Sequence, residues 1–358
     1  MDKTILFICA GYGGGIGKML RFVMKICVGK FRKVYLVHRG RESENDMVPF
    51  GVEELMIPLR GNNILSRRLN EIKNIRNVLK IIKPTIVCCF GSEMGVMLAF
   101  AMVGMKNIKL IQAQRGDPYT LPKLWAILSK WSYIVADYCV FQLEKQGYWY
   151  GKKIMLKSKV IPNAFVSTGN IDCSENKKEK SIVSVGRFVY EKGYESLIKA
   201  FKIVHSKFPD YVLIIYGEGP YRKKYEELIE SLELSDCVKL PGYVSNSMDV
   251  IKNASVFVLS SLYEGIPNVL IEAMAVGVPT VSTDCTPGGP DFLTDHGRRG
   301  LLVPINNERN MADSIIRIIE SPELAMQLSK LGKEIVDELA HERIERKWHD
   351  FFDSFIKD

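Results

Sequence analysis

The chain has 358 residues, of which 47% are hydrophobic and 25% are charged. These fractions are close to those of ordinary globular proteins, so they exclude a disordered chain, a collagen and a coiled coil. The length favours two domains, each large enough to bury a core of its own. The longest apolar stretch, residues 94–105, is too short to cross a bilayer, which argues against an integral membrane protein.

The N-terminus and the cysteines indicate the compartment. The first apolar run begins at Thr4, directly after Met-Asp-Lys, which leaves no room for the apolar core of a secretory signal. We therefore expect a cytoplasmic protein. The eight cysteines are scattered, without the spacing of a metal site or a redox motif, and buried free thiols are their expected state.

Charge differs sharply between the two halves. Residues 1–165 carry 26 Lys and Arg against 11 Asp and Glu, a net charge of +15, whereas residues 166–358 carry 23 against 30, a net charge of −7. The basic half is expected to attract phosphate, anionic lipid or nucleic acid. Nucleic acid is disfavoured because no aromatic and basic recognition motif accompanies the charge.

Short apolar runs alternate with helix-like stretches along the whole chain, a pattern typical of parallel sheets covered by helices on both faces. In the first half, strands are predicted at residues 4–10, 33–38, 85–90, 108–112 and 138–142. In the second half, strands are predicted at residues 181–186, 211–216, 238–240, 256–260 and 280–282. The sequence therefore predicts the α/β class, with two doubly wound, Rossmann-like domains.

The polar segment 166–180 has a charge cluster and no apolar period, which predicts a linker. We place the domains at 1–166 and 167–340. If the two sheets face each other, their carboxyl ends line a central cleft, where such sheets bind ligands. The segment 341–358 has an aromatic stripe at helical spacing, so we expect a helix that packs back on the first domain.

A glycine-rich loop, residues 11–18, follows the first predicted strand and precedes a predicted helix, the position of a phosphate-binding loop. The P-loop and dinucleotide spacings both fail; a P-loop, for instance, needs Gly at Tyr12 and Ser or Thr at Met19. Gly13 and Gly14 are candidates for close backbone approach to a diphosphate or a sugar. A purely conformational role is the alternative.

Arg187 and Lys192 follow the strand predicted at 181–186. Two cations at the tip of a parallel strand would neutralise a diphosphate. Ordinary surface charges are the alternative interpretation.

Two glutamates flank the start of a predicted helix, in which Pro267 marks the first turn. Glu264 lies in the loop ahead of the helix, where its carboxylate can accept hydrogen bonds from sugar hydroxyls. Glu272 lies eight residues later among apolar neighbours, so this charge needs a partner, and ribose hydroxyls are one possibility. The free amides between the two glutamates suit phosphate.

Taken together, the segments 185–201, 213–229, 238–244 and 260–285 resemble the retaining nucleotide-sugar glycosyltransferases of family four, also called glycosyl transferases group 1, which have the GT-B fold. The last segment contains the family's Glu-x₇-Glu pattern. The likeness is strong over residues 160–300 and rests only on layout in the first domain.

The resemblance implies that the second domain binds the donor and the first binds the acceptor. It implies that Glu272 holds the ribose and that Glu264 faces the donor sugar, with the backbone of Gly265 and Ile266 nearby. Retention of the anomeric configuration implies a same-face attack in which the leaving phosphate helps to take the acceptor proton.

The remaining roles implied by the resemblance concern the diphosphate, the base and the acceptor. Arg187 and Lys192 would hold the diphosphate and stabilise the departing charge. Glu218 and Val244 would border the base, and Gly13 and Gly14 would approach the diphosphate from the first domain. Asp117, in the segment 112–118, could polarise the acceptor hydroxyl, while a turn-forming Asp-Pro is the alternative.

The chain departs from the family at Asp291 and Phe292, where relatives usually carry an Arg-Glu pair, so the donor sugar is left open. Family members with a comparable segment ending at Cys285 often use UDP-linked hexoses or N-acetylhexosamines, so the resemblance implies UDP rather than GDP. No Asp-x-Asp occurs, so we expect no metal and no cofactor beyond the nucleotide sugar.

We expect a metal-independent transfer of a hexose or N-acetylhexosamine to a glycan or a polyprenyl-diphosphate-linked acceptor in cell-surface polysaccharide synthesis. The alternatives are an enzyme acting on a soluble sugar or phosphate acceptor, and a catalytically silent subunit. The charge of the first half predicts peripheral contact with the inner face of an anionic membrane. Residues 67–83 and 121–133 are candidate contact segments, with ordinary sheet-covering helices as the alternative.

Overall fold

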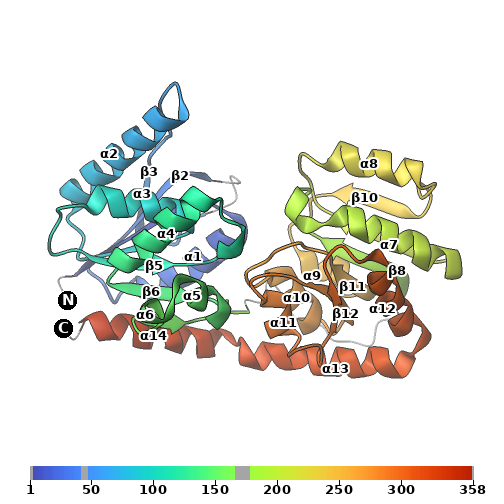
Figure 1. Ribbon diagram of the computed structural model, residues 1–358. Helices are drawn as coiled ribbons and strands as arrows, with labels where there is room; N and C mark the ends of the chain where they lie inside the picture. The colour runs from blue at the N-terminus through green and yellow to red at the C-terminus, as the bar shows by residue number, and fades with distance from the viewer. Residues whose placement is uncertain (1–2, 42–46, 166–177, 357–358) are drawn as a thin grey trace. The chain divides into compact units, whose positions relative to one another are not determined.

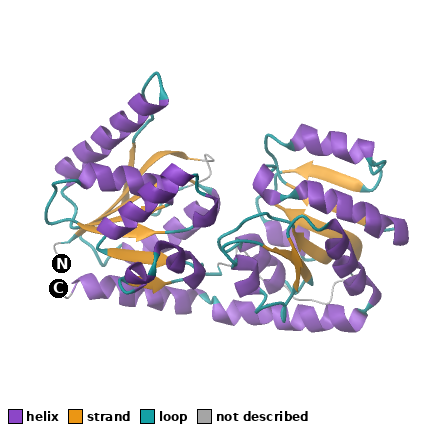
Figure 2. Cartoon of the chain, in the orientation of Figure 1, coloured by secondary structure: helices purple, strands orange, loops and turns teal. Residues whose placement is uncertain are grey.

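The computed structural model describes residues 3–41, 47–165 and 178–356 (Figure 1). The chain divides into two compact units. Unit 1 comprises Met1–Ala164 and His341–Asp358, and unit 2 comprises Phe165–Ala340. The predicted α/β class is confirmed, because each unit contains a parallel sheet with helices on both of its faces (Figure 2).

Unit 1 contains a seven-stranded sheet with the order β3-β2-β1-β4-β5-β6-β7. Its strands are β1 (Thr4–Tyr12), β2 (Lys33–Arg41), β3 (Val52–Met56), β4 (Ile86–Phe90), β5 (Lys109–Ala113), β6 (Tyr138–Phe141) and β7 (Ser158–Val160). All five residues of β4 are buried. A central parallel strand is apolar on both faces because helices cover both sides of the sheet.

The helices of unit 1 are α1 (Gly14–Cys27), α2 (Ile64–Ile82), α3 (Ser92–Met102), the short 3₁₀ helix η1 (Pro118–Thr120), α4 (Lys123–Val135), α5 (Glu144–Tyr150), α6 (Lys152–Met155) and α14 (His341–Ile356). The aromatic stripe of α14 is buried against this unit. Trp348 stacks on Phe90 of β4 with 6.3 Å between ring centroids, and Phe352 meets Phe31 edge-on at 5.9 Å. The last helix of the chain thus completes the core of unit 1.

Unit 2 contains a six-stranded sheet with the order β10-β9-β8-β11-β12-β13. Its strands are β8 (Glu179–Val185), β9 (Val212–Tyr216), β10 (Val238–Gly242), β11 (Ala254–Leu259), β12 (Thr280–Asp284) and β13 (Leu301–Pro304). Its helices are the 3₁₀ turn η2 (Tyr190–Lys192), α7 (Tyr194–Lys207), α8 (Arg222–Ser231), α9 (Ser247–Ile251), α10 (Asn268–Ala275), α11 (Gly289–Leu293), α12 (Glu308–Glu320) and α13 (Pro322–Glu338).

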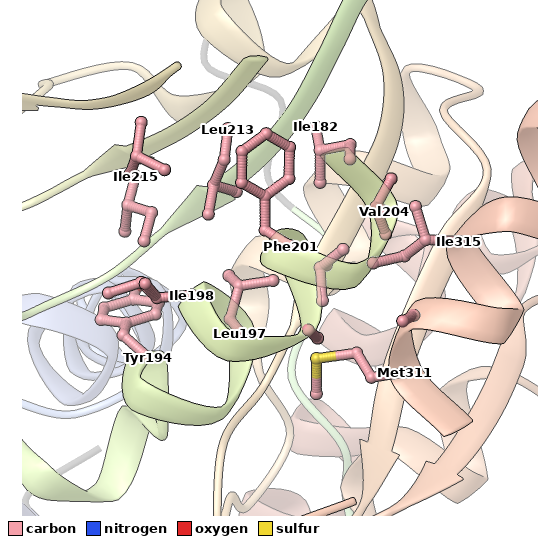
Figure 3. Close-up of a cluster of buried hydrophobic side chains, with 14 of the residues drawn as sticks. Ile182, Tyr194, Leu197, Ile198, Phe201, Val204, Leu213, Ile215, Met311 and Ile315 are labelled. Carbon is pink, nitrogen blue, oxygen red and sulfur yellow. The ribbon is translucent and has the colours of Figure 1, made fainter. Parts of the chain in front are cut away.

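The core of unit 2 forms where α7 lies on the sheet (Figure 3). Leu197 and Phe201 of α7 are fully buried against Leu213 of β9. Met311 and Ile315 of α12 close the same cluster from the neighbouring helix. This packing fixes the strands and the positions of the loops that leave their carboxyl ends.

The sequence did not predict three strands: β3, β7 and β13. Each lies at an edge of its sheet, each is short, and much of each strand is exposed or only half-buried. Edge strands have one neighbour and little apolar periodicity, so they resemble loops in sequence.

Two further expectations concern loops and cysteines. The predicted linker falls mostly on residues 166–177, outside the described residues, and its end belongs to β8. The seven cysteines within the described residues are free and buried; Cys173 lies outside them. Among the helices of the described ranges, none is both long enough and apolar enough to span a membrane.

Candidate active site

The loops at the carboxyl edge of the unit 2 sheet are joined by backbone hydrogen bonds. The loop after β11 donates from Leu262 N–H to the carbonyl of Glu191, in the loop after β8, at 2.8 Å. The same loop donates from Glu264 N–H to the carbonyl of Thr286, which follows β12, at 2.9 Å. Three neighbouring strands therefore present one connected edge, and the side chains on these loops have fixed starting points.

Two glycines make this close approach possible. Gly193 has φ +60°, and a Cβ there would lie 2.2 Å from the carbonyl oxygen of Ser260. Gly217 has φ +153°, and its Cβ would lie 1.9 Å from the carbonyl oxygen of Gly186. Any side chain at either position would force the loops apart, since both obstacles are backbone atoms.

Lys192 and Glu264 form an ion pair at this edge. The Lys192 ammonium donates to Glu264 Oε1, and Ser261 Oγ donates to the same oxygen at 3.0 Å. The Lys192 and Glu264 side chains are only 16% and 17% exposed, so solvent screens this charge pair weakly. The cluster presents a cation suited to phosphate beside a carboxylate suited to sugar hydroxyls.

Glu272 lies in the second turn of α10 and is 8% exposed. Its Oε2 accepts a hydrogen bond from Ser247 Oγ, at the start of α9 just after β10. This bond compensates part of the cost of burying the carboxylate. The sequence-based expectation that this charge needs a partner is met by a residue 25 positions away in the chain.

Arg187 and Glu218 are more exposed. The Arg187 side chain is 69% exposed and lies 3.5 Å from Glu191, a surface ion pair that leaves the guanidinium accessible. Glu218 accepts bonds of 2.7 and 2.9 Å from Arg222. These bonds hold the pKa of Glu218 below its ordinary value. Val244 is half-buried two residues beyond β10.

The segment before α10 is buried at Gly265, Ile266 and Pro267, and Pro267 is the N-cap residue of the helix. Helix α10 therefore begins next to the Lys192–Glu264 pair, and its first amides point toward the carboxyl edge. A phosphate or a sugar could approach the backbone here.

The other predicted site residues belong to unit 1. Gly13 is the N-cap of α1 in extended backbone, and Gly14 is the first residue of that helix. The Asp117 carboxylate accepts a 2.8 Å bond from Tyr119 N–H and caps η1. This is the geometry of the alternative interpretation of Asp117, a turn-forming Asp-Pro, and its proposed acceptor role stays a prediction.

Sequence reasoning missed Ser247 and Ser261, the hydroxyls that orient the two glutamates. Ser261 lies three residues before Glu264, so a local side-chain bond was a detectable signal. Ser247 had no such signal because its contact with Glu272 depends on the fold. Across the described ranges, no group of three or more His, Cys, Asp and Glu residues is arranged to hold a metal ion.

The two doubly wound units have the architecture of the GT-B fold. Two solved structures support the fold over nearly the whole chain. Sucrose-phosphate synthase from Thermosynechococcus elongatus has a TM-score of 0.82 at 19% identity, covering 99% of this chain and 100% of that one. The Anabaena protein HepE in complex with UDP has a TM-score of 0.79 at 18% identity, with the same coverage.

Sequence comparison identifies the family. Residues 172–335 match the family model "Glycosyl transferases group 1". An uncharacterized glycosyltransferase of Methanocaldococcus jannaschii is 28% identical over 77% of this chain and 82% of its own length. A Campylobacter jejuni alpha-1,4-N-acetyl-D-galactosaminyltransferase, which acts on a diNAcBac-PP-undecaprenol-linked glycan, is 23% identical over 97% of both chains. Residues 172–335, most of unit 2, therefore belong to the glycosyl transferases group 1, a family of retaining hexosyltransferases, and the fold of both units is GT-B.

Proposed function

We propose that this glycosyltransferase moves a hexose or N-acetylhexosamine from a UDP-sugar to a glycan or a polyprenyl-diphosphate-linked oligosaccharide. The observation that supports it most is the cluster at the carboxyl edge of unit 2. There the Lys192–Glu264 pair precedes α10, and Glu272 lies inside the same helix, held by Ser247.

The proposed roles follow from charge and position. Glu272 binds the ribose hydroxyls, and Glu264 binds hydroxyls of the donor sugar with the backbone of Gly265 and Ile266. Lys192 and Arg187 hold the diphosphate. The bond between the anomeric carbon and the phosphate oxygen breaks as the acceptor oxygen bonds to the same face of that carbon. The acceptor proton passes to the departing diphosphate, whose negative charge the two cations stabilise.

The remaining site residues complete the proposal. Glu218 and Val244 border the base, and the backbone of Gly13 and Gly14 contacts the diphosphate. Asp117 polarises the acceptor hydroxyl. In these assignments unit 2 is the donor domain and unit 1 the acceptor domain, and the chemistry needs no metal.

The names of relatives support the proposed donor and acceptor classes. HepE has been crystallised with UDP and with UDP-glucose. The Campylobacter jejuni relative acts on an undecaprenol-linked glycan, and a Rhizobium meliloti relative, 32% identical over 43% of each chain, is a lipopolysaccharide core biosynthesis glycosyltransferase. The lipid-linked and lipopolysaccharide acceptors of these relatives, together with the +15 charge of residues 1–165, favour an enzyme that binds peripherally to the inner face of an anionic membrane.

A panel of nucleotide sugars, scored by thermal unfolding, tests the donor. A ligand that binds the folded state raises the midpoint. We expect UDP and at least one UDP-hexose or UDP-N-acetylhexosamine to raise it, and GDP-sugars to leave it unchanged. No shift with any UDP compound would contradict the donor assignment.

A second assay separates the alternatives. UDP release with a polyprenyl-diphosphate glycan supports the proposal. Release only with a soluble sugar or phosphate supports the alternative acceptor class. Binding of a UDP-sugar with no UDP release on any acceptor supports a silent subunit.

A further inference from the structure

Helix α4 of unit 1 has an apolar outer side. Leu124, Ile127 and Ile134 are 65%, 67% and 62% exposed. At 100° per residue the three positions fall within about 80° of one another around the helix axis. The opposite side is buried at Ser129, Ser132 and Tyr133. A surface helix normally exposes polar residues, so an apolar stripe that no described part of the chain covers is unusual.

The first turns of α2 also expose apolar residues. Ile64, Leu65 and Leu69 are 76%, 70% and 59% exposed. The amino-terminal end of α2 projects from the sheet of unit 1 (Figure 1). Arg68 lies over the ring of Trp125 at 5.4 Å, which places these first turns of α2 beside the first turns of α4.

The rest of α2 does not contribute. Ile75 and Leu79 are buried in the core of unit 1, and Arg76 donates to the carbonyls of Ala101 and Val103 near the end of α3. The alternative interpretation of segment 67–83, a sheet-covering helix, therefore holds for this part. The exposed apolar area lies at the start of α2 and along α4.

The surroundings carry one sign of charge. Residues 64–135 contain eleven Lys and Arg and three carboxylates. Two of the carboxylates, Glu71 and Asp117, are buried. The third, Glu93, forms ion pairs with Arg39 and Arg68. Every carboxylate of this segment is therefore buried or neutralised.

We propose that Ile64, Leu65, Leu69, Leu124, Ile127 and Ile134, the α2–α4 face, insert into an anionic lipid bilayer. Lys123 and Lys130 of α4 are exposed beside the stripe and would meet the headgroups. Apolar side chains on a segment with an excess of cations suit an anionic interface. A second copy is disfavoured as the occupant, since two cationic faces repel. The inference rests on the membrane contact proposed above and names the surface that makes it.

Vesicle co-sedimentation tests the face, with vesicles of phosphatidylcholine alone and with phosphatidylglycerol added. The wild type should bind the anionic vesicles, and salt should weaken binding. The double variant Lys123→Gln/Lys130→Gln should lose roughly fivefold in partitioning for each lysine. Leu124→Gln/Ile127→Gln should bind more weakly than the wild type at every salt concentration. It removes the apolar contribution to binding, which salt does not screen.

Matched controls change equally exposed residues of unit 2: Lys199→Gln/Lys330→Gln for charge and Met326→Gln for apolar exposure. These should bind like the wild type. A wild type that ignores all vesicles would refute the membrane contact itself. If the wild type binds and both face variants bind as tightly as it does, the membrane contact stands but the α2–α4 face is not the surface that makes it. A dimer in light scattering that Leu124→Gln/Ile127→Gln dissociates would also overturn it, since a second copy would then cover the face.

Discussion

At the carboxyl edge of its sheet, unit 2 leaves the Lys192–Glu264 pair about one-sixth exposed, beside loops joined by backbone hydrogen bonds. Unit 1 instead holds Arg39 between Glu71 and Glu93, and Glu71 is almost fully buried. The same doubly wound architecture thus places a single ion pair beside the edge loops in one unit and a network of two arginines and two carboxylates in the other. The shared architecture therefore does not tell which unit binds the donor. The side chains at the carboxyl edge of each sheet carry that information.

The largest expected effect separates the two units by stability. Trp348→Ala removes a fully buried ring from the core of unit 1 and should lower its free energy of unfolding by about 3–5 kcal/mol. Thermal unfolding followed by calorimetry should show an earlier transition that UDP does not shift, whereas the UDP-stabilised transition of unit 2 stays in place. Phe201→Ala in the unit 2 core is the matched control. It should lower the midpoint of the unit 2 transition and leave that of unit 1 in place.

The next effect concerns turnover. Lys192→Ala and Arg187→Ala each remove a cation that stabilises the departing diphosphate, so each should lower kcat by about 10²- to 10³-fold. Initial-rate measurements of UDP release check this. The control Lys199→Ala changes an exposed lysine on α7 and should keep full activity. Full activity in both Lys192→Ala and Arg187→Ala would contradict the proposal that these cations stabilise the departing diphosphate.

A smaller effect is expected for donor affinity. Glu272→Ala should weaken UDP binding about tenfold to a hundredfold, because hydrogen bonds to a charged group are worth about 1.5–3 kcal/mol. Ser247→Ala should weaken it less, since it leaves the carboxylate in place and removes only the hydrogen bond from Ser247. Calorimetric titration with UDP and with 2′-deoxy-UDP measures both. If Glu272→Ala binds UDP as tightly as the wild type, the ribose assignment is wrong.

The smallest effect is a pH dependence in unit 1. Burial raises the pKa of Glu93, but hydrogen bonds and charge from Arg39 and Arg68 outweigh it, and the pKa falls below the ordinary 4.5. A depressed pKa stabilises the folded state above pH 4.5, and the contribution is lost as the pH falls below that value. Glu93→Gln should flatten this acid limb by about 1 kcal/mol or less, because the group is partly exposed. In denaturant titrations across this range, the exposed Glu144→Gln should keep the wild-type slope.

Much of the fold follows from sequence because central parallel strands are buried on both faces. The runs that became β4 and β11 are almost wholly apolar, and both were predicted within two residues. The edge strand β3, with the sequence VEELM, has no regular alternation of polar and apolar residues and escaped prediction. The apolar pattern of a strand depends on how much of the strand is buried, and edge strands are less buried than central ones.

The site was predictable where one local segment carried it. Glu264, Pro267 and Glu272 lie within nine residues, so their spacing was visible. The pairing of Lys192 with Glu264 spans 72 positions, and no local pattern encodes it. Likewise, sequence alone favours burial of the apolar residues of α4, and only packing shows that Leu124 and Ile127 face outward while Ser129 is buried.

Hydrogen exchange with and without UDP tests the central claim, that the nucleotide sugar binds at the carboxyl edge of unit 2. Bound ligand slows local opening of the backbone it contacts. The account predicts the strongest added protection in residues 187–193 and 264–272, and loss of that protection in Glu272→Ala. Protection confined to unit 1, with both segments of unit 2 unchanged, would contradict it.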